Sequence, residues 1–129
     1  MSLCLATAAL AVSLAIDSFT LAWTHSVERT EWRETWRIDG AELVLDEARV
    51  RGSGAGMEPP EGAVLVDGWW VYRPPLRVPA LHLAVSGATG SGWRLCSHGE
   101  CHDLERWLTL AGRRPELLRL SAAGRCRPR

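Results

Sequence analysis

The sequence predicts an all-β protein, an antiparallel β-sandwich or a partly closed barrel of about nine or ten short strands. Short runs alternate apolar and polar residues, turn signals recur about every 8–12 residues, and no amphipathic helix longer than about three turns is visible. The chain has 129 residues, 47% of them hydrophobic, which suits one domain with its own core. We predict a single β domain over residues 1–121 and a polar, arginine-rich tail over residues 122–129.

The N-terminal segment, residues 3–16, is apolar apart from Ser and Thr. It has the length of a signal-peptide core, with Ser13-Leu14-Ala15 as a small-residue cleavage site, but no basic residue precedes it. It also fits two strands, residues 3–6 and 10–16, because apolar residues alternate with small ones in the second stretch. We favour the strands. The segment is too short to span a bilayer as a helix.

The next strand has its large side chains on one parity, and the parity reverses from Trp32 onward. The residues on the first parity are Phe19, Leu21, Trp23, His25 and Val27. A reversal requires a turn or bulge, so we place a hairpin at residues 28–31. Asp39-Gly40 and Asp67-Gly68 predict two further hairpins. Residues 104–110 and 115–120 are each compatible with a short helix instead of a strand.

Composition excludes a nucleic-acid surface. The 15 basic residues, all Arg, are balanced by 15 acidic ones and scattered along the chain, whereas a nucleic-acid binder shows a basic stripe and excess positive charge. The 7 Trp against one Phe and one Tyr are unusual. We interpret these Trp as core and sheet-face residues, with an aromatic-lined pocket as the alternative.

Polar groups capable of chemistry gather in one apolar strand. His25, Ser26 and Glu28 lie within four residues, but alternation sends His25 to the face opposite Ser26 and Glu28, so they cannot form a triad by themselves. Glu34 and Glu58 are the carboxylates that we expect to meet them. The plainer interpretation is a hydrogen-bonded core histidine with Ser26 and Glu28 capping a turn. A ligand site is the main alternative.

The glycine-rich loop of residues 52–62 contains Gly54, Gly56 and Glu58. It superficially resembles a phosphate-binding loop, but the Lys-Ser/Thr pair and the following helix are missing. Its glycines fit positive φ angles or a close backbone approach, and such a loop can expose N–H groups to an anion.

The cysteines predict a disulfide rather than a metal site. Cys96 and Cys101 flank a four-residue loop, Ser97 to Glu100, so they lie across a hairpin from each other. Zinc usually takes two ligand pairs from separate segments, and here Cys96, His98, Cys101 and His102 crowd into seven residues. Cys4 and Cys126 can pair, although nothing local supports it. We expect no metal and no cofactor.

Several motifs together resemble the bacterial family catalogued as domain of unknown function 1850. They are the segment Phe19 to Glu28, Glu34, Gly54-Ala55-Gly56 followed by Glu58-Pro59-Pro60, and Asp67-Gly68-Trp69-Trp70. The resemblance runs from about residue 3 to residue 110 and implies no established activity. It implies a context: genes of this family often stand beside tripartite TRAP transporters of the TAXI type, which pair a soluble binding protein with a sodium-driven permease.

We therefore expect a non-enzymatic accessory or binding domain, associated with the periplasm or cell envelope and with TRAP-type solute uptake. Its partner would be a transporter component or a small organic solute. The expected site residues are His25, Ser26, Glu28, Glu34, Gly54, Gly56 and Glu58. The alternatives are a hydrolase using His25 or Ser26 with a carboxylate, and a structural interaction domain anchored by Trp69-Trp70.

Overall fold

The computed structural model describes residues 1–24, 30–51, 61–85, 92–122 and 124–128. These ranges contain twelve strands and one short helix, and every strand pair is antiparallel, which confirms the predicted fold class. The elements are β1 (Leu3–Ala6), β2 (Ala11–Leu14), β3 (Ser18–Thr24), β4 (Glu31–Asp39), β5 (Glu42–Arg51), β6 (Val64–Val66), β7 (Trp69–Tyr72), β8 (Arg77–Val78), β9 (Ala80–Ala84), β10 (Arg94–Ser97), β11 (Glu100–Asp103), α1 (Leu104–Trp107) and β12 (Leu117–Ala122).

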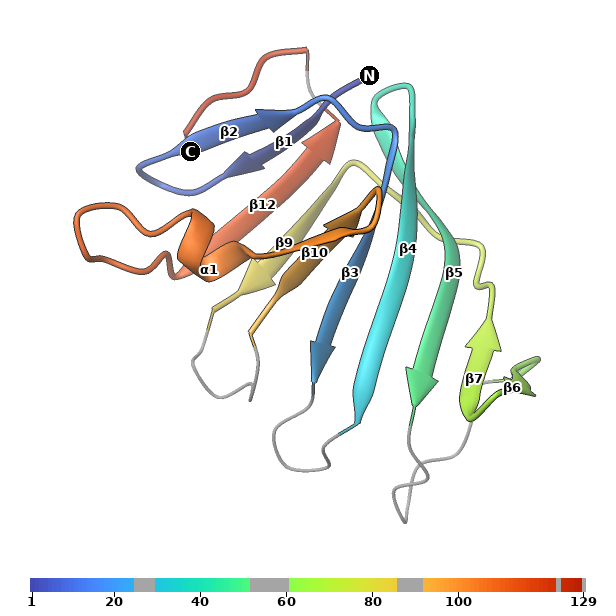
Figure 1. Cartoon of the computed structure of the whole chain (residues 1–129). Helices are drawn as coiled ribbons and strands as arrows, with labels where there is room; N and C mark the ends of the chain where they lie inside the picture. The colour runs from blue at the N-terminus through green and yellow to red at the C-terminus, as the bar shows by residue number, and fades with distance from the viewer. Residues whose placement is uncertain (25–29, 52–60, 86–91, 123, 129) are drawn as a thin grey trace.

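Two sheets form an open sandwich. The small sheet has the order β2-β1-β12-β9, and the large sheet has the order β11-β10-β3-β4-β5-β7-β6, with β8 added to β5. Figure 1 shows the small sheet against one half of the large sheet, while β3, β4 and β5 run on past it. The inner face of the large sheet therefore has a covered half and a half that extends beyond the small sheet.

The core lies between the sheets. Leu5 and Leu118 of the small sheet and Leu21 and Trp36 of the large sheet belong to one cluster of buried side chains, and Trp36 is only 1% exposed. Alternation explains why these positions are apolar, because residues two apart in a strand share a face. Each fully buried leucine stabilises the fold by roughly 1.5–3 kcal/mol relative to an exposed one.

A β-bulge explains an irregular pattern in β5. Leu43 and Leu45 are buried on odd positions, whereas Ala48 and Val50 are buried on even ones. The register with β4 shifts between Thr35 and Trp36, so that one residue, Asp46, has no partner across the ladder. The extra residue restores the inward direction of the apolar side chains on both sides of it.

The hairpin turns follow the predicted chemistry. Asp67 and Gly68 have φ angles of 50° and 85° and join β6 to β7, as two-residue turns with both central φ angles positive do. His98 and Gly99, with φ angles of 52° and 80°, join β10 to β11 in the same way. Ser97 pairs with Glu100, so the turn of the cysteine hairpin has two residues rather than the four predicted.

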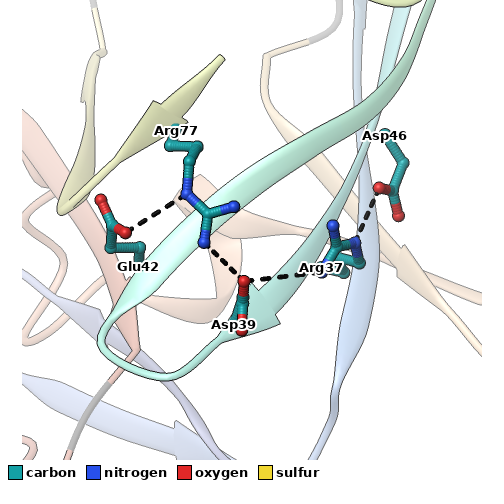
Figure 2. A network of polar contacts seen from close by, with 5 residues as sticks. All are labelled: Arg37, Asp39, Glu42, Asp46 and Arg77. Atoms are coloured by element: carbon teal, nitrogen blue, oxygen red, sulfur yellow. Dashed lines mark hydrogen bonds and ion pairs between the residues drawn. The ribbon is translucent and has the colours of Figure 1, made fainter. Parts of the chain in front are cut away.

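An ion-pair network fastens β8 to the β4–β5 hairpin. Figure 2 shows Arg77 between Asp39 and Glu42, with Arg37 reaching both Asp39 and Asp46. The Arg37 Nε to Asp46 Oδ1 distance is 2.8 Å. Arg77 lowers the pKa of Asp39 by hydrogen bonding and by its charge, and Asp39 in turn raises the pKa of Arg77. All five side chains are well exposed to solvent, so the network adds little to stability.

The two ends of the chain meet on the small sheet. Residues 3–6 and 11–14 are strands, and a disulfide joins Cys4 of β1 to Cys126 beyond β12.

Asp103 accepts hydrogen bonds from the amides of Glu105 and Arg106 and thereby caps α1. In the described ranges, no helix reaches the length and apolarity that crossing a membrane requires.

Candidate functional site

One carboxylate lies on the inner, otherwise apolar face of the large sheet. Glu34 of β4 is paired with Leu21 of β3 on one side and with Ala48 of β5 on the other. Ala48 is paired in turn with Tyr72 of β7. Residues directly opposite each other in a ladder point to the same face. Glu34 and Tyr72 therefore belong to one row of side chains on the face that carries the core.

Burial perturbs both polar groups of this row. Loss of solvent raises the pKa of Glu34 above its ordinary value, and the hydrogen bond from Trp36 offsets part of this shift. The Trp36 Nε1 donates to Glu34 Oε1 over 3.3 Å. The pKa of Tyr72 is raised by its own burial and by the charge of Glu34. Neutral forms are favoured when a charge loses water without gaining a counter-charge.

Glu34 has no cationic partner in the part of the chain that the structure describes. The ion pairs within these residues use other acids, including Glu31 and Glu47 on the opposite face of the sheet. A half-buried carboxyl without a counter-charge costs stability in the free protein, and such groups occur preferentially at binding and catalytic sites.

A row of tryptophan side chains lies next to Glu34 on the same face of the sheet. Trp23 is paired with Trp32, two residues from Glu34, and their rings stack with centroids 6.1 Å apart and an interplanar angle of 6°. Trp93 packs on the other side of Trp23 at 4.9 Å, and its Nε1 donates to the carbonyl oxygen of Ala84 over 3.0 Å. All three rings are half-buried.

The row continues across β5. Val50 is paired with Trp32 on one side and with Trp70 of β7 on the other, so Trp70 shares the inner face. Glu34 thus lies between the buried core around Trp36 and a row of partly accessible aromatic rings. The row stands at the ends of β3, β4 and β5 that extend beyond the small sheet in Figure 1.

A carboxylate beside aromatic faces is suited to hold a positive charge. Indole faces attract cations through the ring quadrupole, and Trp does so most strongly. A carboxylate poor in solvent attracts a cation more than an exposed one does, because the local dielectric is low. The same arrangement gives no stabilisation to an anion, since Glu34 is itself negative when ionised.

Most of the predicted site lies outside the described residues. This holds for His25, Ser26, Glu28, Gly54, Gly56 and Glu58. Of the residues predicted to bind a ligand, only Glu34 lies within the described ranges. Sequence reasoning missed Tyr72 and the Trp23–Trp32 pair as site residues. The sequence did contain a signal for this pair, because the reversal of parity predicted a hairpin with Trp23 before it and Trp32 after it.

The remaining candidates have structural partners. Cys96 and Cys101 form a disulfide across the β10–β11 pair. His102 stacks on Trp107 with ring centroids 4.2 Å apart. Within the described ranges, no group of three or more His, Cys, Asp or Glu side chains is placed to hold a metal ion.

Trp69 and Trp70 do not form a common anchor. They are neighbours in β7 and therefore point to opposite faces of the sheet. The guanidinium carbons of Arg33 and Arg51 lie 5.2 Å and 5.6 Å from the Trp69 ring centroid, so two cations cover Trp69 on the outer face.

Comparison with protein-family models shows which family the chain belongs to. Residues 19–104 match the family described as Domain of unknown function (DUF1850). The chain belongs to the DUF1850 family. The part of this DUF1850 protein that matches includes Glu34, Tyr72 and the tryptophan row, while β1, β2 and β12 lie outside the match. Nothing matches it among curated proteins or among solved structures.

Proposed function

We propose that this DUF1850 domain is a non-enzymatic module that binds a small organic cation, an amine or a quaternary ammonium compound, at Glu34. The observation that carries the proposal is the carboxyl of Glu34, which lies on an apolar face and has no cationic partner among the described residues. Bound cations are expected to sit against the Trp23–Trp32 pair, with the Glu34 carboxylate as counter-charge.

We also propose a broader role for this binding. We infer that binding serves solute uptake by a TRAP-type transporter in the cell envelope, the context expected from the resemblance described in the sequence analysis. The two disulfides, Cys4–Cys126 and Cys96–Cys101, support an oxidising compartment, because disulfides persist in the periplasm and are rare in the cytosol. Co-elution of the purified domain with the soluble binding protein of a TAXI-type TRAP transporter tests this link; separate elution at all concentrations would contradict it.

Calorimetric titration tests the ligand class. Choline is a suitable probe, because 3,3-dimethylbutanol has nearly the same shape without the charge. We expect saturable binding of choline and at least tenfold weaker binding of the neutral isostere. Recovery of choline chemically unchanged after prolonged incubation is the expected result for a non-enzymatic site.

Three variants locate the site. Glu34→Gln keeps the shape and hydrogen bonding of the side chain but removes its charge, and we expect choline affinity to fall by about tenfold, or about 1.4 kcal/mol. Trp32→Leu removes an aromatic face and should weaken binding as well. Glu100→Gln is the matched control, because the side chain of Glu100 is 80% exposed on the β10–β11 hairpin. Equal affinities in wild type and Glu34→Gln would contradict the proposal.

A further inference from the structure

A second hollow lies on the other sheet, away from Glu34. It is an open pocket of about 780 Å³ between the β1–β2 turn and the segment that joins α1 to β12. The small sheet therefore offers a concave surface of the size that small-molecule sites usually have. None of its lining residues comes from β3, β4, β5 or β7, which carry the row of Glu34 and Tyr72 and most of the tryptophan row.

Much of the pocket lining is apolar. Leu108, Leu110 and Leu117 line the pocket together with alanines of the β1–β2 turn. Leu108 is buried, but Leu110 and Leu117 are 47% and 44% exposed. A ligand that covers these two leucines would gain binding free energy from their burial. The gain is roughly 25 cal/mol for each Å² of apolar surface removed from water.

The charged part of the pocket lining is mostly basic. Arg113, Arg114 and Arg119 line the pocket, against one acid, Glu116. Arg114 is paired with Glu105 at 3.7 Å. Neither Arg113 nor Arg119 makes an ion pair within the part of the chain that the structure describes. Two guanidinium groups are thus available beside an apolar surface.

Local hydrogen bonds hold both walls in place. Leu110 and Arg113 exchange backbone hydrogen bonds of 3.1 Å and 3.0 Å around a turn in which Ala111 and Gly112 have positive φ angles. On the opposite wall, the Thr7 hydroxyl accepts a hydrogen bond from the amide of Leu10 over 3.0 Å. A pocket with preformed walls loses little entropy when a ligand enters.

We propose that this pocket binds a carboxylic acid with an apolar body, such as a medium-chain acyl carboxylate. The carboxylate would lie at Arg113 and Arg119, because guanidinium groups form paired hydrogen bonds with carboxylates. The acyl chain would cover Leu110 and Leu117. A concave hollow suits one chain entering from water better than it suits a flat lipid surface. The site is independent of Glu34 and of the function proposed above.

Calorimetric titration with octanoate, below its micelle concentration, tests this site. We expect saturable binding at one site and at least tenfold weaker binding of 1-octanol. The double variant Arg113→Gln/Arg119→Gln should lose at least tenfold in octanoate affinity. Arg127→Gln is the matched control, because Arg127 is an exposed tail residue that does not line the pocket. Glu34→Gln should bind octanoate like wild type.

A second variant tests the pocket independently, in case the double arginine variant does not fold. Ala8→Phe places a ring in the pocket from the exposed β1–β2 turn and should block octanoate while the melting temperature stays near that of wild type. The proposal is overturned if octanoate does not saturate, if octanol binds equally well, or if the double variant binds like wild type. Binding to phosphatidylglycerol vesicles without binding of free octanoate would also overturn it, and would indicate a membrane-facing surface.

Discussion

The indole nitrogen of Trp36 donates a hydrogen bond to the carboxylate of Glu34 over 3.3 Å, from a ring that is 1% exposed. The two residues are one pleat apart in β4, so they share the inner face of the sheet. The bond ties Glu34 to the centre of the core. Among the described residues, no hydrogen bond is made to the other carboxylate oxygen of Glu34.

Removing the charge of Glu34 should stabilise the free protein at neutral pH. We expect Glu34→Gln to raise the free energy of unfolding by on the order of 1 kcal/mol, because a half-buried charge without a counter-charge among the described residues is replaced by a neutral amide. Chemical denaturation at pH 7 measures this. A Gln variant less stable than wild type would contradict the account of Glu34 as a destabilising group.

The stability difference between Glu34→Gln and wild type should depend on pH. The folded-state pKa of Glu34 lies above the ordinary 4.5, so its stabilising contribution is complete below pH 4.5 and is lost as the pH rises through the raised value. The advantage of Glu34→Gln should therefore be small in acid and should grow as the pH rises through that window. Denaturation curves at several pH values check the sign, and an advantage that shrinks toward neutral pH would be inconsistent with it.

The two disulfides should differ in their contribution to stability. Cys4 and Cys126 are 122 residues apart, whereas Cys96 and Cys101 are separated by 5. Loop-closure entropy predicts a loss of about 5 kcal/mol when the long-range bond is removed by paired Cys→Ala changes and about 2 kcal/mol for the hairpin bond. Denaturation of the two double variants measures both losses. A larger loss from the hairpin bond would show that native-state packing decides instead.

The ion-pair network of Figure 2 should act above pH 3.8 and only weakly. Arg77 lowers the folded-state pKa of Asp39, so the stability contributed by Asp39 is present above 3.8 and is lost as the pH falls through the lowered value. Asp39→Asn should therefore lower the melting temperature slightly at pH 7 and not at all in strong acid. Repeating the melt in 1 M salt should reduce the difference, because these side chains are exposed.

The core should respond far more strongly than the surface. Leu118 of β12 is 0% exposed and faces the large sheet within the main cluster. Leu118→Ala should lower the free energy of unfolding by about 2–5 kcal/mol, because it leaves a cavity. Leu117→Ala is the matched control from the same strand, since Leu117 is 44% exposed. Similar losses from both variants would argue against the two-sheet core.

Local pattern was sufficient to predict much of the fold. Alternation identified the strand of Phe19 and Leu21, and the turn chemistry of Asp67-Gly68 identified its hairpin, because both depend on neighbouring residues. The pairing of β1 with β12 could not be predicted, since it joins opposite ends of the chain. The Cys4–Cys126 disulfide depends on that pairing and was open for the same reason.

The candidate site was predicted only through one residue. Glu34 was predicted as a carboxylate that would meet His25 or Ser26, but its row with Tyr72 depends on the register of three strands. The bulge at Asp46 sets part of that register, and a bulge is not visible in the alternation of a single strand. The tryptophan row likewise needed the pairing of β3 with β4 and the approach of Trp93 from β10.

The carboxyl of Glu34 is partly shielded from solvent, and we propose that it binds a cation. Its pKa can be followed directly by the chemical shift of the ¹³C-labelled Glu34 carboxyl during a pH titration, with and without saturating choline. We predict a pKa above 4.5 in the free protein and a fall when choline binds, because the ligand stabilises the charged form. An ordinary pKa in the free protein, or a pKa that choline leaves unchanged, would contradict the account.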